Sequence, residues 1–117
     1  MTNTGVTFTN TGLSNGTIYY FEVSALNGIG ESTNSAEASV RPVSLTPAQI
    51  ALAVTNSQMQ IVWPQDHTGW QVQVQTNAPG VGLGTNWITV PGSGLTNQFI
   101  LPVDVANGSV FIRLVSP

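Results

Sequence analysis

The sequence predicts an all-β protein, and three observations support this prediction. Charged residues make up 6% of the 117 residues, against about 25% in average globular domains, and Thr, Asn, Ser and Gln take their place. This composition, with 12 Gly and 7 Pro, is typical of short strands joined by tight turns. No segment repeats apolar residues at the period of an amphipathic helix, whereas several segments alternate apolar and polar residues as strands do.

The front of the chain predicts three strands separated by turns. Tyr19, Phe21 and Val23 fall on one face of the clearest of these strands, because successive side chains of a strand point to opposite sides. Asn, Gly and Ser cluster between the strands and supply the usual turn chemistry. We expect strands at 6–9, 19–25 and 36–40, with turns at 10–12, 14–16 and 27–30.

This front segment resembles the C-terminal half of a fibronectin type III domain. Leu13 and Tyr19 match the leucine and tyrosine of that family's tyrosine corner, in which the phenol hydroxyl bonds to loop backbone. The run Tyr19-x-Phe21-x-Val23-x-Ala25-x-Asn27-x-x-Gly30-x-Ser32 matches its strand F and the turn into strand G. The resemblance implies strands E, F and G within residues 5–42. It also implies that strands A to C come before them, where only a dozen residues stand.

A second pattern begins after residue 48. We expect residues 43–48 to link the partial domain, residues 1–42, to a second β-sandwich at 49–117. The alternation is clearest at 70–75, where three Gln side chains alternate with apolar ones. Strands are expected near 50–54, 58–63, 70–75, 87–90, 99–103 and 109–115, with loops or turns at 64–69, 79–84, 91–94 and 106–108. This spacing is typical of a fibronectin-like or immunoglobulin-like sandwich.

The second part also carries resemblances. Trp63 stands where strand B of a fibronectin-like domain carries its tryptophan, and residues 70–74 resemble strand C. Asn107-Gly108-Ser109-Val110-Phe111 is similar to Asn15-Gly16-Thr17-Ile18-Tyr19, so the final strand resembles strand F, with no strand G after it. The segment from 61 to 114 resembles the C-terminal module of large secreted multidomain proteins of environmental bacteria such as the verrucomicrobia. This resemblance implies a place at the C-terminal end of a longer, extracellular or cell-surface protein.

The charge and composition exclude several classes of partner. The chain has no Lys, and Arg41 and Arg113 are its only cations, so it lacks the charge that neutralises phosphates of nucleic acid or of anionic membranes. It has no Cys, which excludes disulfides and cysteine-based metal sites. No segment reaches the ~18 apolar residues of a membrane span. We therefore expect no nucleic-acid partner and no membrane span.

We expect no enzyme activity, cofactor or metal. Glu22 and Glu37 fall at outward strand positions, where a solvated charge is the usual finding. Asp66-His67 lies in a loop bounded by Pro and Gly, where turn chemistry is more common than a metal site or an acid/base pair. The glycine-rich run at 80–84 is followed by a predicted strand, whereas a phosphate-binding loop requires a helix.

Three tryptophans raise the alternative of carbohydrate binding. Trp63 and Trp70 share the phase of the apolar residues of their strands and are expected in the core. Trp87 follows the glycine-rich loop and is the candidate for an exposed ring that stacks on a sugar. The Gln rows at 58–60 and 71–75 are expected to face outward, where they suit glycans or another sheet. Arg113 is expected to pair with Asp104 or Asp66, or to cap loop carbonyls.

The expected function follows from the half domain at the front. A small sheet with one apolar face is marginal in water, so either the second sandwich or a neighbouring chain should cover it. The candidate assembly residues are Val6, Phe8, Tyr19, Phe21 and Val23. We expect a non-catalytic structural or adhesive module that associates with itself by strand complementation into an oligomer or fibre. The alternatives are a polysaccharide-binding accessory module and a passive C-terminal spacer.

Overall fold

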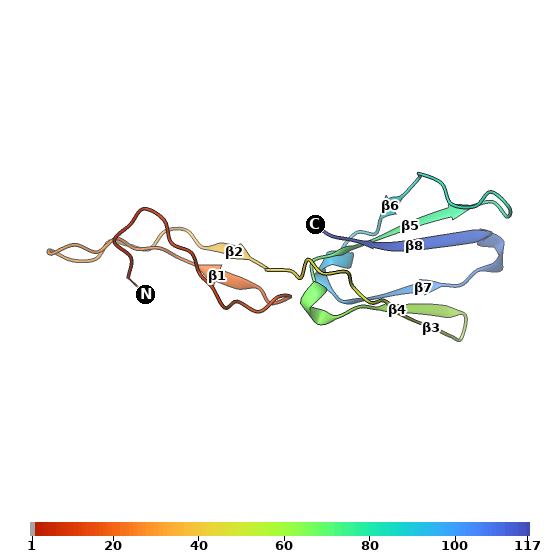
Figure 1. Cartoon of the computed structure of the whole chain (residues 1–117), viewed down its shortest axis with the longest axis horizontal. Helices are drawn as coiled ribbons and strands as arrows, with labels where there is room; N and C mark the ends of the chain where they lie inside the picture. Colours follow the sequence, from red (N-terminus) through yellow and green to blue (C-terminus); the bar gives the residue numbers. More distant parts are fainter. Residues whose placement is uncertain (1) are drawn as a thin grey trace.

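The computed structural model describes residues 2–117, which extend over 72 × 26 × 23 Å. The described residues contain eight strands, and every strand pair is antiparallel, so the all-β prediction is confirmed. A two-stranded hairpin and a two-sheet sandwich lie end to end along the longest axis (Figure 1). Within the described residues, no helix has the length and apolarity that a membrane crossing requires.

The hairpin is formed by β1 (Tyr19–Phe21) and β2 (Ala38–Val40), with Tyr19 opposite Val40. Backbone pairing continues beyond both strands, because the Ser35 amide donates to the Val23 carbonyl at 2.8 Å. The turn at its tip is closed by Asn27, whose Oδ1 accepts hydrogen bonds from two following amides. The predicted turn at 27–30 is therefore present.

The strand predicted at 6–9 does not form in the described structure, and this prediction is wrong. The alternating segment is there, but residues 7–14 carry no strand, bridge or turn assignment. A strand requires a neighbour that accepts and donates its backbone hydrogen bonds. Within residues 2–117 no strand lies in register with this segment, so alternation alone did not suffice.

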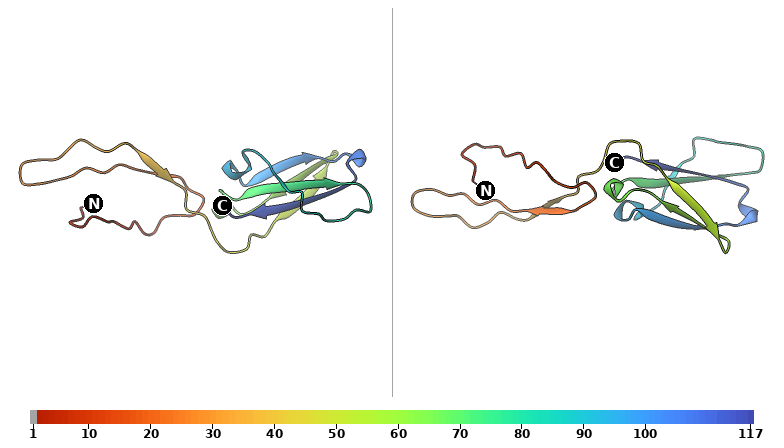
Figure 2. Two further views of the ribbon diagram at one scale, coloured as in Figure 1. Left: turned by 90° about the horizontal axis from the view of Figure 1, so that it is seen from above. Right: turned by 60° about the horizontal axis from the view of Figure 1, so that its bottom comes forward.

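The sandwich has two antiparallel sheets of three strands each within residues 49–117. One sheet has the order β3-β4-β7, formed by β3 (Ala51–Thr55), β4 (Gln58–Val62) and β7 (Gln98–Pro102). The other has the order β6-β5-β8, formed by β6 (Ile88–Thr89), β5 (Gln71–Asn77) and β8 (Ser109–Val115). From above, strands of one sheet lie across those of the other (Figure 2).

The core of the sandwich lies between the facing sides of the two sheets. Ile61, Trp63 and Val72 are buried, which confirms that Trp63 belongs to the core. Around them pack the partly buried side chains of Met59, Val74, Val90, Phe99, Ile112 and Leu114. Each fully buried side chain of this size stabilises the fold by about 1.5–3 kcal/mol. The core thus rests on residues spaced by two along β4, β5 and β8.

Three short 3-10 helices stand where loops or turns were predicted. They are η1 (Gln65–His67), η2 (Ser93–Leu95) and η3 (Val105–Asn107). Asp104 begins η3, and its carboxylate accepts a hydrogen bond from the Ala106 amide at 2.9 Å. Residues 43–48 connect the hairpin to the sandwich and pass close to η1, because the Ser44 amide donates to the Asp66 carbonyl at 2.9 Å.

Candidate assembly surface

One side of the sandwich ends in a strand edge without a neighbour. β8 pairs with β5 along its whole length, from Ser109 opposite Asn77 to Val115 opposite Gln71. On its other side no strand of the described part of the chain pairs with it. An edge strand of this length presents a row of unpaired N–H and C=O groups to another strand.

The inner face of β3 is uncovered at the edge of the other sheet. Leu52 stands opposite Ile61, and Val54 stands opposite Met59. Directly opposed residues of an antiparallel pair share a face, so both side chains point to the core side of their sheet. Even so, their exposed fractions are 61% for Leu52 and 59% for Val54, with 43% for Ile50 in the same phase. Inward aliphatic side chains this exposed indicate that the second layer does not extend over β3.

The unpaired edge of β8 and the uncovered inner face of β3 lie on the same side of the sandwich. β7 lies on the side of β6, because Pro91 and Gly92, just beyond β6, line one depression with Phe99 and Ile100 of β7. The orders β3-β4-β7 and β6-β5-β8 then leave β3 on the side of β8. We name this side the open flank and define it as Ile50, Leu52 and Val54 together with the outer edge of β8.

The predicted assembly residues of the hairpin are only partly brought together. Tyr19 and Phe21 are half-buried, and the Tyr19 hydroxyl accepts a hydrogen bond from the Ser14 amide at 3.0 Å. This tie to loop backbone is the contact expected of a tyrosine corner. Val23, Val6 and Phe8 are exposed. The sandwich does not cover them, because it lies at the end of the hairpin (Figure 1), so the cover expected from the second domain is absent within residues 2–117.

The hairpin is joined closely to the end of the sandwich. The Gly16 amide donates to the Pro42 carbonyl at 2.7 Å, and the Arg41 guanidinium donates to the Gly94 carbonyl at 3.2 Å. Gly16 adopts φ +79°, and a Cβ at this position would lie 2.1 Å from the Gln65 carbonyl oxygen. Only glycine permits both this conformation and this close approach.

His67 fixes the connecting segment to the sandwich. Its ring is buried, with Nε2 2.8 Å from the Thr46 carbonyl oxygen and Nδ1 2.7 Å from Asp66 Oδ1. A carbonyl oxygen only accepts, so Nε2 donates, and an imidazolium donates to both partners. The Thr46 carbonyl and the Asp66 carboxylate raise the pKa of His67, although burial opposes them. Trp70 packs edge-on against this ring and donates to the Ser44 carbonyl at 2.9 Å.

These contacts were not predicted from the sequence. Asp66-His67 was interpreted as turn chemistry, and it does form η1. Its second role, holding residues 44–46, depends on contacts between segments about twenty residues apart. The nearest signal was the placement of two aromatic rings, His67 and Trp70, immediately after a core strand. Trp70, predicted in the core, is half-buried at this junction.

Trp87 and Arg113 meet on the outer face of the β6-β5-β8 sheet. The Arg113 guanidinium carbon lies 4.2 Å from the centroid of the Trp87 ring, and Arg113 Nε donates to Gln73 Oε1 at 2.8 Å. Gln73 in turn donates to Thr89 at 3.0 Å. The prediction that Arg113 pairs with Asp104, Asp66 or loop carbonyls is wrong. The partly buried Trp87 ring thus already has a cationic partner.

The glycine-rich loop is anchored by a buried glutamine. Gln75 was expected to face outward with Gln71 and Gln73, but it is buried. Its Oε1 accepts from the Gly84 amide at 2.8 Å and from Asn77 at 2.8 Å, while its Nε2 donates to the Gly84 carbonyl. A buried amide must be hydrogen-bonded in this way to offset its desolvation. The loop covers the outer side of β5 at this point.

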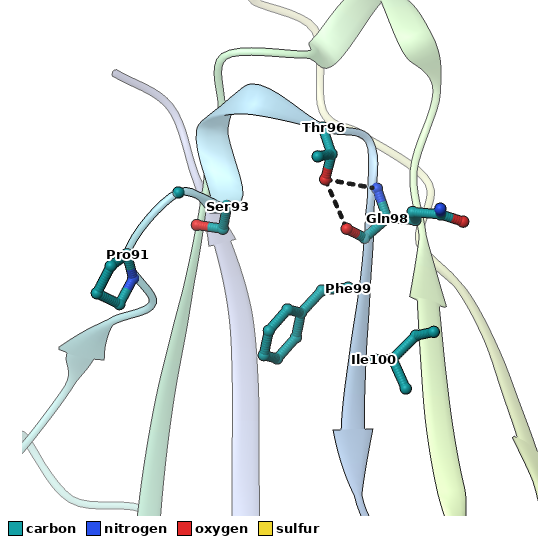
Figure 3. A pocket seen from close by; sticks show the side chains of 7 residues that line it. Pro91, Ser93, Thr96, Gln98, Phe99 and Ile100 are labelled. Atoms are coloured by element: carbon teal, nitrogen blue, oxygen red, sulfur yellow. Dashed lines mark hydrogen bonds between the residues drawn. The ribbon is translucent and has the colours of Figure 1, made fainter.

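A depression on the described surface beside β7 offers no convergent chemistry. It measures about 350 Å³ and is lined by Pro91, Gly92, Ser93, Thr96, Gln98, Phe99 and Ile100. Thr96 Oγ1 donates to the Gln98 carbonyl at 2.6 Å and lies 3.3 Å from the Gln98 amide, so these polar groups satisfy one another (Figure 3). Among residues 2–117, no three His, Asp or Glu side chains gather in a possible metal site.

Comparison of the chain with known protein families, with curated proteins and with solved structures found no match. The candidate function therefore depends on the geometry described above.

Proposed function

We propose that this chain is a non-catalytic structural module that associates with further copies of itself by adding a strand to the open flank. The observation that carries the proposal is the exposure of Leu52 and Val54, which face inward beside the unpaired edge of β8. A strand added to β8 would complete the backbone ladder and cover these side chains. Strand addition of this kind gives affinity through backbone hydrogen bonds and specificity through alternate side chains.

The energetics support a strand as the missing partner. Fully burying a Leu or Val side chain contributes about 1.5–3 kcal/mol, so covering several partly exposed ones offsets part of the cost of association. Proteins commonly protect their edge strands with charges, proline or bulges. β8 carries one charge, Arg113, whose side chain is engaged with Gln73 and Trp87. The edge is thus poorly protected against pairing.

The geometry also bears on the form of the assembly. The open flank belongs to the sandwich, whereas the uncovered apolar side chains of the hairpin lie in the other part of this elongated molecule (Figure 1). Contacts between two different surfaces are heterologous, and such contacts extend into a fibre unless their rotation closes a ring. We place this module outside the cell or at its surface, in keeping with the secreted bacterial module that residues 61–114 resemble.

A carbohydrate-binding role is less well supported. Stacking on a sugar requires an accessible aromatic face. The Trp87 ring is partly buried, and the Arg113 guanidinium lies over it at 4.2 Å. Trp63, which is buried in the core, offers no such face.

The open flank is tested with two matched substitutions on β3. Leu52→Asp places a charge on the inner face, and Ala53→Asp places the same charge on the next residue, which faces the other way. Both positions are exposed, so neither change disturbs the core of a single chain. In sedimentation equilibrium from micromolar to millimolar concentration, we expect the unmodified chain and Ala53→Asp to exceed the 12.3 kDa of one chain, and Leu52→Asp to remain monomeric. A monomeric unmodified chain throughout would overturn the proposal.

A further inference from the structure

We propose that the strand added to the open flank is the segment Val6–Thr9 of a second copy. This inference rests on the function proposed above and names the partner of the same site. It joins two features of the described structure. One is an alternating segment that forms no strand, and the other is a strand edge that has no neighbour.

The donor segment pairs with no strand in the described part of its own chain. Val6 is fully exposed, and Phe8 is 56% exposed. The backbone of residues 8–13 makes no hydrogen bond within the described part of the chain. Upstream, the side chain of Asn3 bonds to the Thr7 carbonyl, which leaves the two apolar side chains unconstrained. A segment that pairs with no strand loses no existing ladder when it pairs with another strand.

The spacing of the donor matches the spacing of the flank. Val6 and Phe8 are two residues apart, so in an extended strand they point to the same side. Leu52 and Val54 have the same spacing on β3, and Ile112 and Leu114 have it on the inner side of β8. In the register that places Val6 and Phe8 on the inner side, a donor paired along β8 directs both apolar side chains over the uncovered side chains of β3. Thr7 and Thr9 then face solvent.

The charges permit this contact. The chain carries no charged residue before Glu22 and none between Arg41 and Asp66. The donor segment and the whole of β3 lie within these two stretches, so burying them together desolvates no charged side chain. Burying an unpaired charge would cost several kcal/mol. The contact thus depends on apolar cover and backbone pairing, which a strand supplies.

The position of the donor favours a second copy. In the described structure residues 6–9 run beside the hairpin, on the far side of the junction from the sandwich (Figure 1). The bond from the Gly16 amide to the Pro42 carbonyl holds the start of the hairpin at that junction. In this orientation the segment lies away from the open flank of its own sandwich. The flank that accepts it is therefore that of another molecule.

Two complementary variants of the full chain test the inference. Val6→Asp with Phe8→Asp removes the donor and leaves the flank intact. Leu52→Asp blocks the flank and leaves the donor intact. All three side chains are exposed in the single chain, so these changes do not affect its core. We expect each variant alone to sediment as a 12.3 kDa monomer and an equimolar mixture to form a dimer with one chain of each kind.

The control carries the same charges on the opposite face of the same segment. Thr7→Asp with Thr9→Asp should associate like the unmodified chain, because these side chains point away from β3. If the donor variant associates like the unmodified chain while Leu52→Asp is monomeric, another strand occupies the flank; the inference is then wrong and the proposed function stands. If both variants are monomeric and their mixture is too, the donor–flank pairing is also wrong. A monomeric unmodified chain would overturn both proposals.

Discussion

At the scale of single residues, His67 fixes the segment that connects the two parts of the chain. Its two ring nitrogens contact the Thr46 carbonyl and the Asp66 carboxylate, and both contacts favour the protonated ring. Among the described residues, Asp66 is the ionisable group that faces it. The pKa of His67 is therefore raised from its ordinary value of 6.5.

This geometry predicts a pH-dependent stability. The stabilisation by protonated His67 is complete below about pH 6.5, where the unfolded chain is also protonated. It is lost as the pH rises through the raised pKa of the folded state. Urea unfolding at a series of pH values should show the free energy of unfolding of the unmodified chain falling over this window. His67→Gln should show no such fall, and parallel curves for the two proteins would contradict the assignment.

Trp87 leads to a second prediction at this scale. Trp87→Leu keeps an apolar side chain but removes the ring that the Arg113 guanidinium contacts. The expected loss of stability is about 0.5–1 kcal/mol, the usual contribution of a cation–π contact near the surface. Urea unfolding measures this loss. Combined with Arg113→Gln, the substitution should cost less than the sum of the two single changes, and strict additivity would show that the two side chains are not coupled.

At the scale of elements, the junction between the hairpin and η1 requires glycine at position 16. Gly16→Ala should cost more than 1–2 kcal/mol, roughly the penalty for a left-handed alanine, because its Cβ would also lie 2.1 Å from the Gln65 carbonyl oxygen. Gly12 has a similar φ of +76° and no atom within 4 Å of its Cβ position. Gly12→Ala therefore carries the conformational cost alone. Equal losses in urea unfolding would argue against the close contact.

The strands of the sandwich show which elements the sequence predicts well. The strands at 58–63, 70–75 and 109–115 were located closely, because inward side chains such as Ile61, Val72 and Leu114 bury their surface within the described sandwich. The segment at 6–9 has an equally clear alternation, but no strand within residues 2–117 pairs with it. The anchoring of residues 44–46 was missed for a related reason. It depends on His67 and Trp70, which no local pattern connects to Ser44.

At the scale of the whole molecule, the sequence predicted the outward-facing surfaces less well than the core. Of the two covers expected for the front segment, the second sandwich or a neighbouring chain, the first required the two parts to pack side by side. The junction instead directs them end to end, which gives the extent of 72 Å. The sequence also did not predict that Leu52 is exposed. An inward position on a strand implies burial only where a second layer of the sandwich lies over that strand.

The number of strands in the sandwich also decides how the molecule would carry a mechanical load. Six strands within residues 49–117 return the chain to the side on which it entered, so Pro117 lies close to the junction in every view (Figures 1 and 2). Tension between the two ends of the described chain would therefore bypass most of the sandwich. It would act on the short stretch held by His67 and Trp70 and on the end of the β5–β8 pair where Gln71 stands opposite Val115, and would peel β8 from β5 starting at that end. Most of the sandwich would carry no load, so its open flank would remain folded and accessible to another strand until β8 begins to peel away.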